Sequence, residues 1–120
     1  MPEPNRHRLV PLEPVLIYSV STTPYFVSEP IHAQVEGLEW SEAEAGGHGL
    51  IQRQRWTGTI NDAGVIATAD SIGSLRTALG KALADLRGEL ELADDASLTT
   101  PELKYKRFLM DTLREPPAQS

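Results

Sequence analysis

The sequence contains no cysteine among its 120 residues. Disulfide bonds, thiolate zinc sites and cysteine nucleophiles are therefore excluded. No apolar run approaches the roughly 20 residues that are needed to span a bilayer. The first eight residues contain two prolines and lack the apolar segment of a secretion signal. We therefore expect a cytoplasmic or particle-associated protein that makes no membrane contact.

Aromatic residues and basic residues are both scarce. Aromatic residues make up only 6% of the chain, so a core must be built from Leu, Ile, Val and Ala. The chain has 11 Lys and Arg against 17 Asp and Glu, which gives a net charge of −6. Residues 9–48 hold six Glu and neither Lys nor Arg. This charge disfavours a general nucleic-acid binder and a polybasic membrane anchor. A nucleic-acid partner stays open only through a local basic face of the second predicted helix.

Proline is concentrated at the N-terminus, with four prolines in residues 1–14. Because proline fixes φ and removes a backbone donor, this segment is predicted to be an extended arm. The arm is a disordered tail, or lies over a partner, or covers the second helix. We expect residues 15–115 to form one domain and residues 116–120 to form a short tail.

Alternating and β-branched patterns predict strands in the first half of the domain. Residues 15–20 read VLIYSV, and residues 31–36 alternate apolar with polar side chains. Gly37 is interpreted as a bulge in this second strand. Residues 50–60 form a further strand, and the turn Asn61–Gly64 leads into residues 65–69. An antiparallel meander of about four or five strands over residues 15–69 follows.

Two helices are predicted in the second half. Leucines at steps of three and four form an apolar stripe over residues 71–91, which Asp70 or Ser71 can cap. A second helix over residues 100–114 begins at Thr99, with Pro101 in the first turn and Glu102 completing a capping box. The fold class is therefore α+β, with a sheet followed by two C-terminal helices.

The hairpin around Gly47 has two competing registers. If the numbers of facing residues sum to 95, Glu42 faces Arg53 and Trp40 faces Arg55. If they sum to 96, Trp40 faces Trp56. We favour the first register because it neutralises charge, although each such pair contributes only about 0.2–1 kcal/mol. The hairpin is either an ordinary solvated pair of strands or a protruding arm that contacts a partner.

Each helix carries an unusual face. Small residues recur at positions 73, 77, 80, 84 and 88 of the first helix, which suits close packing within the chain or against another subunit. The second helix is apolar over more than half of its circumference, a wider arc than a small domain needs. We therefore predict two groups of partner-binding residues, in the hairpin and in the second helix: Trp40, Arg53, Arg55, Trp56, Tyr105, Phe108, Leu109 and Met110.

No catalytic or metal-binding constellation stands out. The three histidines lack the spacing of a metal motif, and no serine lies in the context of a nucleophile elbow. No glycine-rich loop has the spacing of a phosphate cradle. We therefore expect no enzyme activity, no metal and no cofactor.

A non-enzymatic interaction or assembly subunit is the leading functional hypothesis, with phage or virion particles among the candidate assemblies. Protein partners or self-association are expected. The strand of residues 65–69, running through Asp70 into a leucine helix, resembles the strand–turn–helix unit of small βββα regulatory domains in some antitoxins. That resemblance implies the alternative: a small acidic regulator or inhibitor of antitoxin or immunity type, or a transcriptional regulator. Such a protein would bind a basic partner or nucleic acid.

Overall fold

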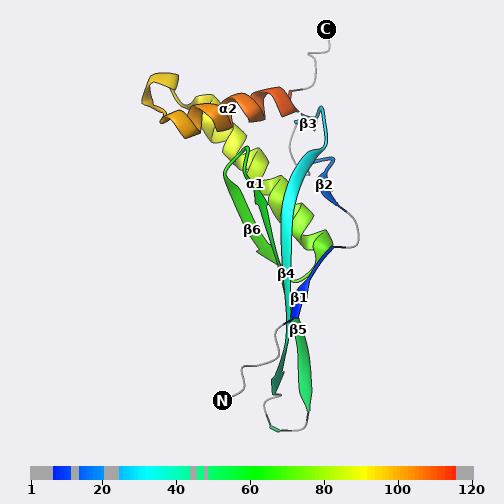
Figure 1. Cartoon of the computed structure of the whole chain (residues 1–120). Coiled ribbons are helices and arrows are strands. Elements are labelled where there is room, and N and C mark those ends of the chain that lie inside the picture. The colour runs from blue at the N-terminus through cyan, green and yellow to red at the C-terminus, as the bar shows by residue number, and fades with distance from the viewer. Residues whose placement is uncertain (1–6, 12–13, 21–24, 44–45, 48, 116–120) are drawn as a thin grey trace.

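The fold is an antiparallel sheet with one C-terminal helix on its face and a second helix that packs against the first at one end of the molecule. The computed structural model describes residues 7–11, 14–20, 25–43, 46–47 and 49–115 (Figure 1). In the main sheet the strand order is β1-β4-β5-β6, and β2 also pairs with β4. The predicted α+β class, with a sheet followed by two C-terminal helices, is confirmed. The elements are β1 (His7–Leu9), β2 (Val15–Ile17), β3 (Phe26–Val27), β4 (Ile31–Ala43), β5 (Leu50–Ile60), β6 (Val65–Ala69), α1 (Ile72–Leu92), η1 (Asp95–Ser97), α2 (Thr100–Thr112) and β7 (Leu113–Arg114).

The proline-rich N-terminal segment joins the sheet. β1 pairs antiparallel with β4, so that Arg8 faces Leu38. After the prolines, β2 pairs with an earlier part of the same strand, with Ile17 facing Ile31. β1 and β2 therefore follow one another along β4. One sequence prediction placed the N-terminal segment over the second helix. This prediction is wrong for the described residues of the segment, because they pair with β4.

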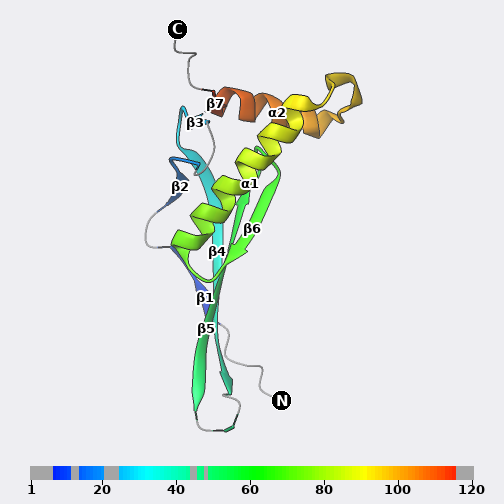
Figure 2. The ribbon, with the colours of Figure 1, turned by 180° about the vertical axis from the view of Figure 1, so that it is seen from behind.

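A second, two-stranded sheet joins distant parts of the chain. Phe26 in β3 faces Arg114 in β7, and the Ser28 N–H donates to the Thr112 carbonyl at 2.8 Å. The short apolar segment around Phe26 therefore lies outside the main sheet. Figures 1 and 2 place this pair at the end of the molecule where α2 lies.

The leucine stripe of α1 forms the centre of the core. Leu75, Leu79 and Leu83 are completely buried. Gly58 in β5 lets the helix approach the sheet closely, because a Cβ atom built there would lie 2.7 Å from Leu79 Cδ1. The hydrophobic effect of burying one such leucine side chain is about 1.5–3 kcal/mol.

Both helix N-termini have the caps that the sequence predicts. The Ser71 side chain accepts a hydrogen bond from the Ser74 N–H at 3.1 Å. At α2, Thr99 and Glu102 form a complete capping box: the Thr99 N–H donates to Glu102 Oε1 at 2.9 Å and the Glu102 N–H donates to Thr99 Oγ1 at 3.3 Å. These bonds satisfy backbone donors that the first turn of a helix leaves unpaired.

Arg87 is a charged residue in the core, with 3% of its surface exposed. Its Nε donates to the Leu113 carbonyl at 2.5 Å, and its Nη1 donates to Glu91 at 2.9 Å. The guanidinium also lies 4.1 Å from the centroid of the Tyr25 ring. Arg87 therefore links α1 to the segments that lead into β3 and β7.

Gly37 marks the last point at which the two long strands touch the core. It faces Trp56 without any shift of register, so the predicted bulge is absent. A Cβ atom at Gly37 would lie 2.6 Å from two carbons of the Trp56 ring and 2.9 Å from Leu9 Cβ. The missing side chain thus gives the indole room to lie against β4.

Replacing Gly37 with alanine is expected to lower the free energy of unfolding by about 1–3 kcal/mol, because the rigid indole cannot make room for a methyl group. Urea unfolding followed by circular dichroism measures the change. The matched control is Gly73→Ala, where a Cβ atom meets nothing within 4 Å. That helical substitution should leave stability unchanged or raise it by up to about 1 kcal/mol. Equal effects at the two positions would contradict the packing described for Gly37.

The capping box makes a pH-dependent contribution to stability. The Thr99 backbone N–H, and then the Thr99 side chain, hold the pKa of the Glu102 carboxyl below its ordinary value of 4.5. A lowered folded-state pKa gives stability that is present above pH 4.5 and is lost as the pH falls through the folded-state value. Glu102→Gln should therefore be less stable than the natural protein at neutral pH, and the difference should close in acid. Unfolding curves at several pH values test this, and a difference independent of pH would contradict it.

Candidate functional site

The outer halves of β4 and β5 extend beyond the core as a two-stranded arm (Figures 1 and 2). We define the arm as residues Leu38–Ala43 of β4 and Leu50–Arg55 of β5, beyond the Gly37–Trp56 pair. The molecule measures 62 × 33 × 26 Å and has a radius of gyration of 18.2 Å. A compact domain of this length has a radius of about 13.6 Å. The long axis seen in Figure 1 follows the arm.

The register of the arm differs from both sequence predictions. Facing residues sum to 93, so that Trp40 faces Arg53 and Glu42 faces Ile51. The favoured sum of 95 is wrong by two residues, and the sum of 96 is wrong by three. A shift of two residues leaves every side chain on its predicted face, because side chains alternate with period two. Glu42 and Arg53 consequently still meet, as diagonal neighbours.

Most of the large apolar side chains of the arm lie on the face that points away from α1, whereas Leu50, which is 71% exposed, lies on the other face. Trp56 and Gly58 face the helix, so alternate residues of both strands form the opposite side. We call this side of the arm the outer face; it consists of Leu38, Trp40, Glu42, Ile51, Arg53 and Arg55. Leu38 is 41% exposed and Ile51 is 36% exposed, although both are large apolar residues. The outer face therefore presents apolar and basic groups together.

Short-range polar contacts order part of the outer face. The Trp40 Nε1–H donates to Glu42 Oε1 at 2.8 Å, and Arg53 Nε lies 3.4 Å from Glu42 Oε2. The carboxylate thus holds the indole on one side and the guanidinium on the other. Arg55 has no side-chain hydrogen bond or ion pair within the described residues. An exposed ion pair of this kind contributes only about 0–1 kcal/mol, so these groups remain available to a partner.

The opposite side of the arm, which faces the same way as α1, is mainly polar. Gln52 Nε2 donates to Ser41 Oγ at 2.9 Å across the two strands. Gln54 Nε2 donates to the Asp70 carbonyl at 3.1 Å, next to the start of α1. The two faces of the arm therefore differ in chemistry, and the outer face holds its Trp and both of its Arg residues.

The structure divides the predicted partner-binding residues into two groups. Trp40, Arg53 and Arg55 lie together on the outer face of the arm. Trp56 is 8% exposed and Leu109 is completely buried, so their side chains belong to the core and not to an accessible surface. In α2, Tyr105 and Phe108 pack against the core, and Met110 is 37% exposed.

Most side chains of the wide apolar arc of α2 pack against the core of the same chain. A Cβ atom at Gly64 would lie 2.8 Å from the Tyr105 ring, which shows how closely this ring covers the turn between β5 and β6. Some of the small residues of α1 allow close packing within the chain. A Cβ atom built at Gly80 would lie 3.3 Å from the Ser19 carbonyl oxygen. Gly73 faces open space. The arm, and not α2, therefore carries the main group of exposed candidate residues.

Leu38 and Ile51 belong to the outer face but were missed by the sequence analysis. The sequence contains a signal for Leu38. Apolar residues of β4 occupy odd positions up to Val35, and then even positions at Leu38 and Trp40. The apolar pattern thus changes face at Gly37, where the strand leaves the core.

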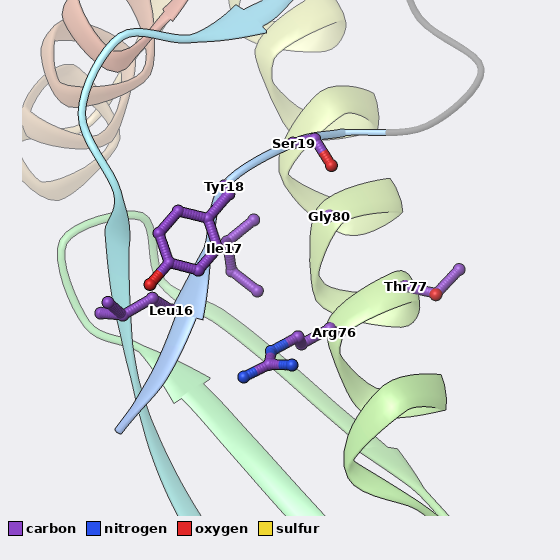
Figure 3. Close-up of a pocket in the computed structure, with 7 residues that line it drawn as sticks. All are labelled: Leu16, Ile17, Tyr18, Ser19, Arg76, Thr77 and Gly80. Atoms are coloured by element: carbon purple, nitrogen blue, oxygen red, sulfur yellow. The ribbon is translucent and has the colours of Figure 1, made fainter. Parts of the chain in front are cut away.

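A cavity of about 130 Å³ lies between the end of β2 and α1 (Figure 3). Ligand pockets are usually about 300–1,000 Å³ in volume. Arg76 extends from α1 toward β2 at this cavity, and the exposed Tyr18 lies on the other side. The cavity has one charged residue and no pair of acid and base. Its lining residues are Leu16, Ile17, Tyr18, Ser19, Arg76, Thr77 and Gly80.

The described residues contain no group of three or more His, Asp or Glu side chains positioned to hold a metal ion. Within the same residues, no helix is both long and apolar enough to cross a membrane. Comparisons with models of protein families, with curated proteins and with solved structures found no match.

The register of the arm can be tested with an engineered disulfide, because the chain has no cysteine of its own. Ser41→Cys with Gln52→Cys should form a disulfide upon mild oxidation, since these residues face each other. The control Ser41→Cys with Gln54→Cys matches the sum of 95 and should remain reduced, because its Cα atoms lie too far apart. Mass spectrometry of the oxidised proteins distinguishes the two. A disulfide in the control alone would contradict the register.

Proposed function

We propose that this protein is a non-enzymatic interaction or assembly subunit, which binds a protein partner through the outer face of its arm. The observation that carries the proposal is the change of the apolar pattern at Gly37. Up to that residue the apolar side chains of β4 face the core, and beyond it Leu38 and Trp40 face away from the helices. Apolar groups placed on a face with no core beneath it are typical of a docking surface.

The physical properties of the arm support this proposal. An isolated two-stranded hairpin is marginally stable in water, because it buries little apolar surface. A partner that covers Leu38, Trp40 and Ile51 would supply the missing burial. Trp and Arg residues are enriched among the groups that dominate binding energy at interfaces, and the outer face carries both types.

The exposed area of the chain also supports association. The accessible surface is 8489 Å². A folded monomer of this mass exposes about 6,400 Å². A standard interface removes about 800 Å² from each partner. A subunit of a larger homomeric or heteromeric particle, such as a phage or virion component, fits these dimensions.

The alternative, a small acidic regulator or inhibitor, gains no support from the arm. Such a protein would present Glu39, Glu42 and Glu44 as one exposed acidic patch. Glu39 and Glu42 project from opposite faces of β4, and Glu42 is already neutralised by Arg53. Glu44 lies outside the described residues. We therefore keep the assembly function as the proposal.

Photo-crosslinking in the cells that make the protein tests this function. A photoreactive amino acid at Ile51 should give crosslinks to protein, because this side chain lies on the outer face. The matched control is Leu92, which is 89% exposed but lies at the end of α1. Trp40→Ala with Arg55→Ala should reduce the yield at Ile51 at least about tenfold, as loss of interface anchors does. Arg76→Ala on α1 should not. Equal crosslinking at Ile51 and Leu92, or none at Ile51, would contradict the proposal.

A further inference from the structure

One face of the main sheet has no helix over it in the described part of the chain. α1 packs on the other face, against β2, β5 and β6, and lies in front of the sheet in Figure 2. Alternation places every second residue of all five strands on the same side as the outer face of the arm. We call this complete surface the open sheet face. Besides the six residues of the outer face it consists of Arg8, Leu16, His32, Gln34, Glu36, Thr57, Thr59, Ile66 and Thr68, none of which is buried.

Exposed apolar side chains continue from the arm onto the body of the sheet. Ile66 in β6 is 68% exposed, and Leu16 in β2 is partly exposed. The outer face of the arm has only six side chains, whereas a standard interface uses about 20–30 residues from each partner. A partner that binds the arm through a standard interface therefore also covers part of the body.

The open sheet face carries little of the negative charge of the chain. It has two acidic residues, Glu36 and Glu42, and three basic ones, so its formal charge is +1 in a chain of −6. Arg8 Nε lies 3.1 Å from Glu36 Oε1, and Arg53 Nε lies 3.4 Å from Glu42 Oε2, so both acids are already paired. Like charges that meet across an interface oppose association. Two copies of this acidic chain can meet at this face without bringing their excess carboxylates together.

The order of the strands suits a two-fold contact between two such faces. β4 and β5 form the centre of the sheet, with β1 and β2 beside β4 and with β6 beside β5. A two-fold axis along the arm, between β4 and β5, places β4 of one copy over β5 of the other, and β6 over β1 and β2. Stacked sheets keep their strand directions within about 30° of each other, so the two arms would run side by side. β1 and β6 lie in the plane of the sheet and α1 lies behind it, so none of them stands between the two faces.

The strands that this axis superimposes carry complementary groups. Arg55 has no side-chain hydrogen bond or ion pair within the described residues, and it would lie over Leu38 and next to Trp40 of the other copy. A guanidinium against an indole ring gains a cation–π attraction. Ile51 would likewise lie over β4 of the other copy, where Trp40 offers it an apolar surface. Each apolar group of one arm thus meets the other arm instead of water.

We propose that a second copy of this chain binds the open sheet face, with the two sheets face to face and the arms parallel. The contact uses the same surface on both copies, so it closes as a symmetric dimer. The helices of both copies lie on the outside of this dimer. This inference rests on the proposed function and names the partner of the outer face.

A substitution on the body of the sheet tests the dimer with the full-length protein. Ile66→Glu should weaken dimerisation at least about tenfold in sedimentation velocity, because each dimer would then hold two additional carboxylates in the contact. The matched control is Leu92→Glu, which makes the same change in charge at a residue that is 89% exposed at the end of α1. The control should dimerise as the natural protein does. Circular dichroism should be the same for all three proteins, because both side chains are exposed.

Crosslinking of the purified protein tests the orientation of the two copies. A photoreactive amino acid at Ile51 is used in an equimolar mixture of protein with natural nitrogen and protein labelled with ¹⁵N. Crosslinks between a labelled and an unlabelled copy should fall on residues Leu38–Ala43 of β4, which the two-fold axis places over Ile51. The same amino acid at Leu92 should give no crosslinks between copies.

Several outcomes would overturn the inference. These are a natural protein that stays monomeric at every soluble concentration, a dimer that Ile66→Glu leaves unchanged, and crosslinks from Ile51 that fall on α1 or β6 of the other copy. If the purified protein is monomeric but Ile51 crosslinks to a different protein in cells, binding of a second copy is rejected and the proposed function stands. If Ile51 also gives no crosslinks in cells, both are rejected.

Discussion

The contact between Gly37 and Trp56 is the constraint on which the rest of the structure depends. Trp56 fills the last part of the space between the sheet and α1, and it can do so only because the facing residue has no side chain. Leu9 of β1 closes the same contact, so the N-terminal segment, the central hairpin and the helix layer meet there. On one side of this pair the strands belong to a core; on the other they are a free ribbon. The position of one glycine therefore sets the boundary between the folded body and the arm.

A second buried group fixes the opposite end of the body. Arg87 brings together α1, the Leu113 carbonyl and the Tyr25 ring, which come from three distant parts of the sequence. A buried guanidinium is stable only when its donors are satisfied, so these segments are held in one arrangement. The small sheet of β3 and β7 follows from this arrangement, since Leu113 is both the acceptor for Arg87 and a residue of β7. The body is thus held together at both ends, by Trp56 next to the arm and by Arg87 next to β7.

Local signals in the sequence were sufficient for much of this fold. The leucine stripe, the Ser71 cap and the Thr99–Glu102 capping box predicted both helices, because each depends on residues within a few positions of one another. The register of the arm could not be derived in the same way. Alternation fixes only which residues share a face, and sums of 93 and 95 satisfy it equally. Pairing of β1 with β4, and of β3 with β7, joins residues far apart in sequence and leaves no local pattern. For the candidate site, the Trp and Arg residues were identified. Leu38 was missed because the change of pattern at Gly37 was interpreted as a bulge, and Ile51 was missed because it follows another apolar residue, Leu50, so that alternation does not mark its face.

The continuity of β4 and β5 has a mechanical consequence. The same two strands that form the arm also form the centre of the sheet, and ten residue pairs join them without interruption. A pull on one strand along the axis of the arm acts in shear on this whole ladder, because the hydrogen bonds lie perpendicular to the strands. All the hydrogen bonds between β4 and β5 share such a load at once, and the load is passed to the part of the sheet that packs against α1. A tether built in this way would resist tension along its length far better than a loop attached at the surface.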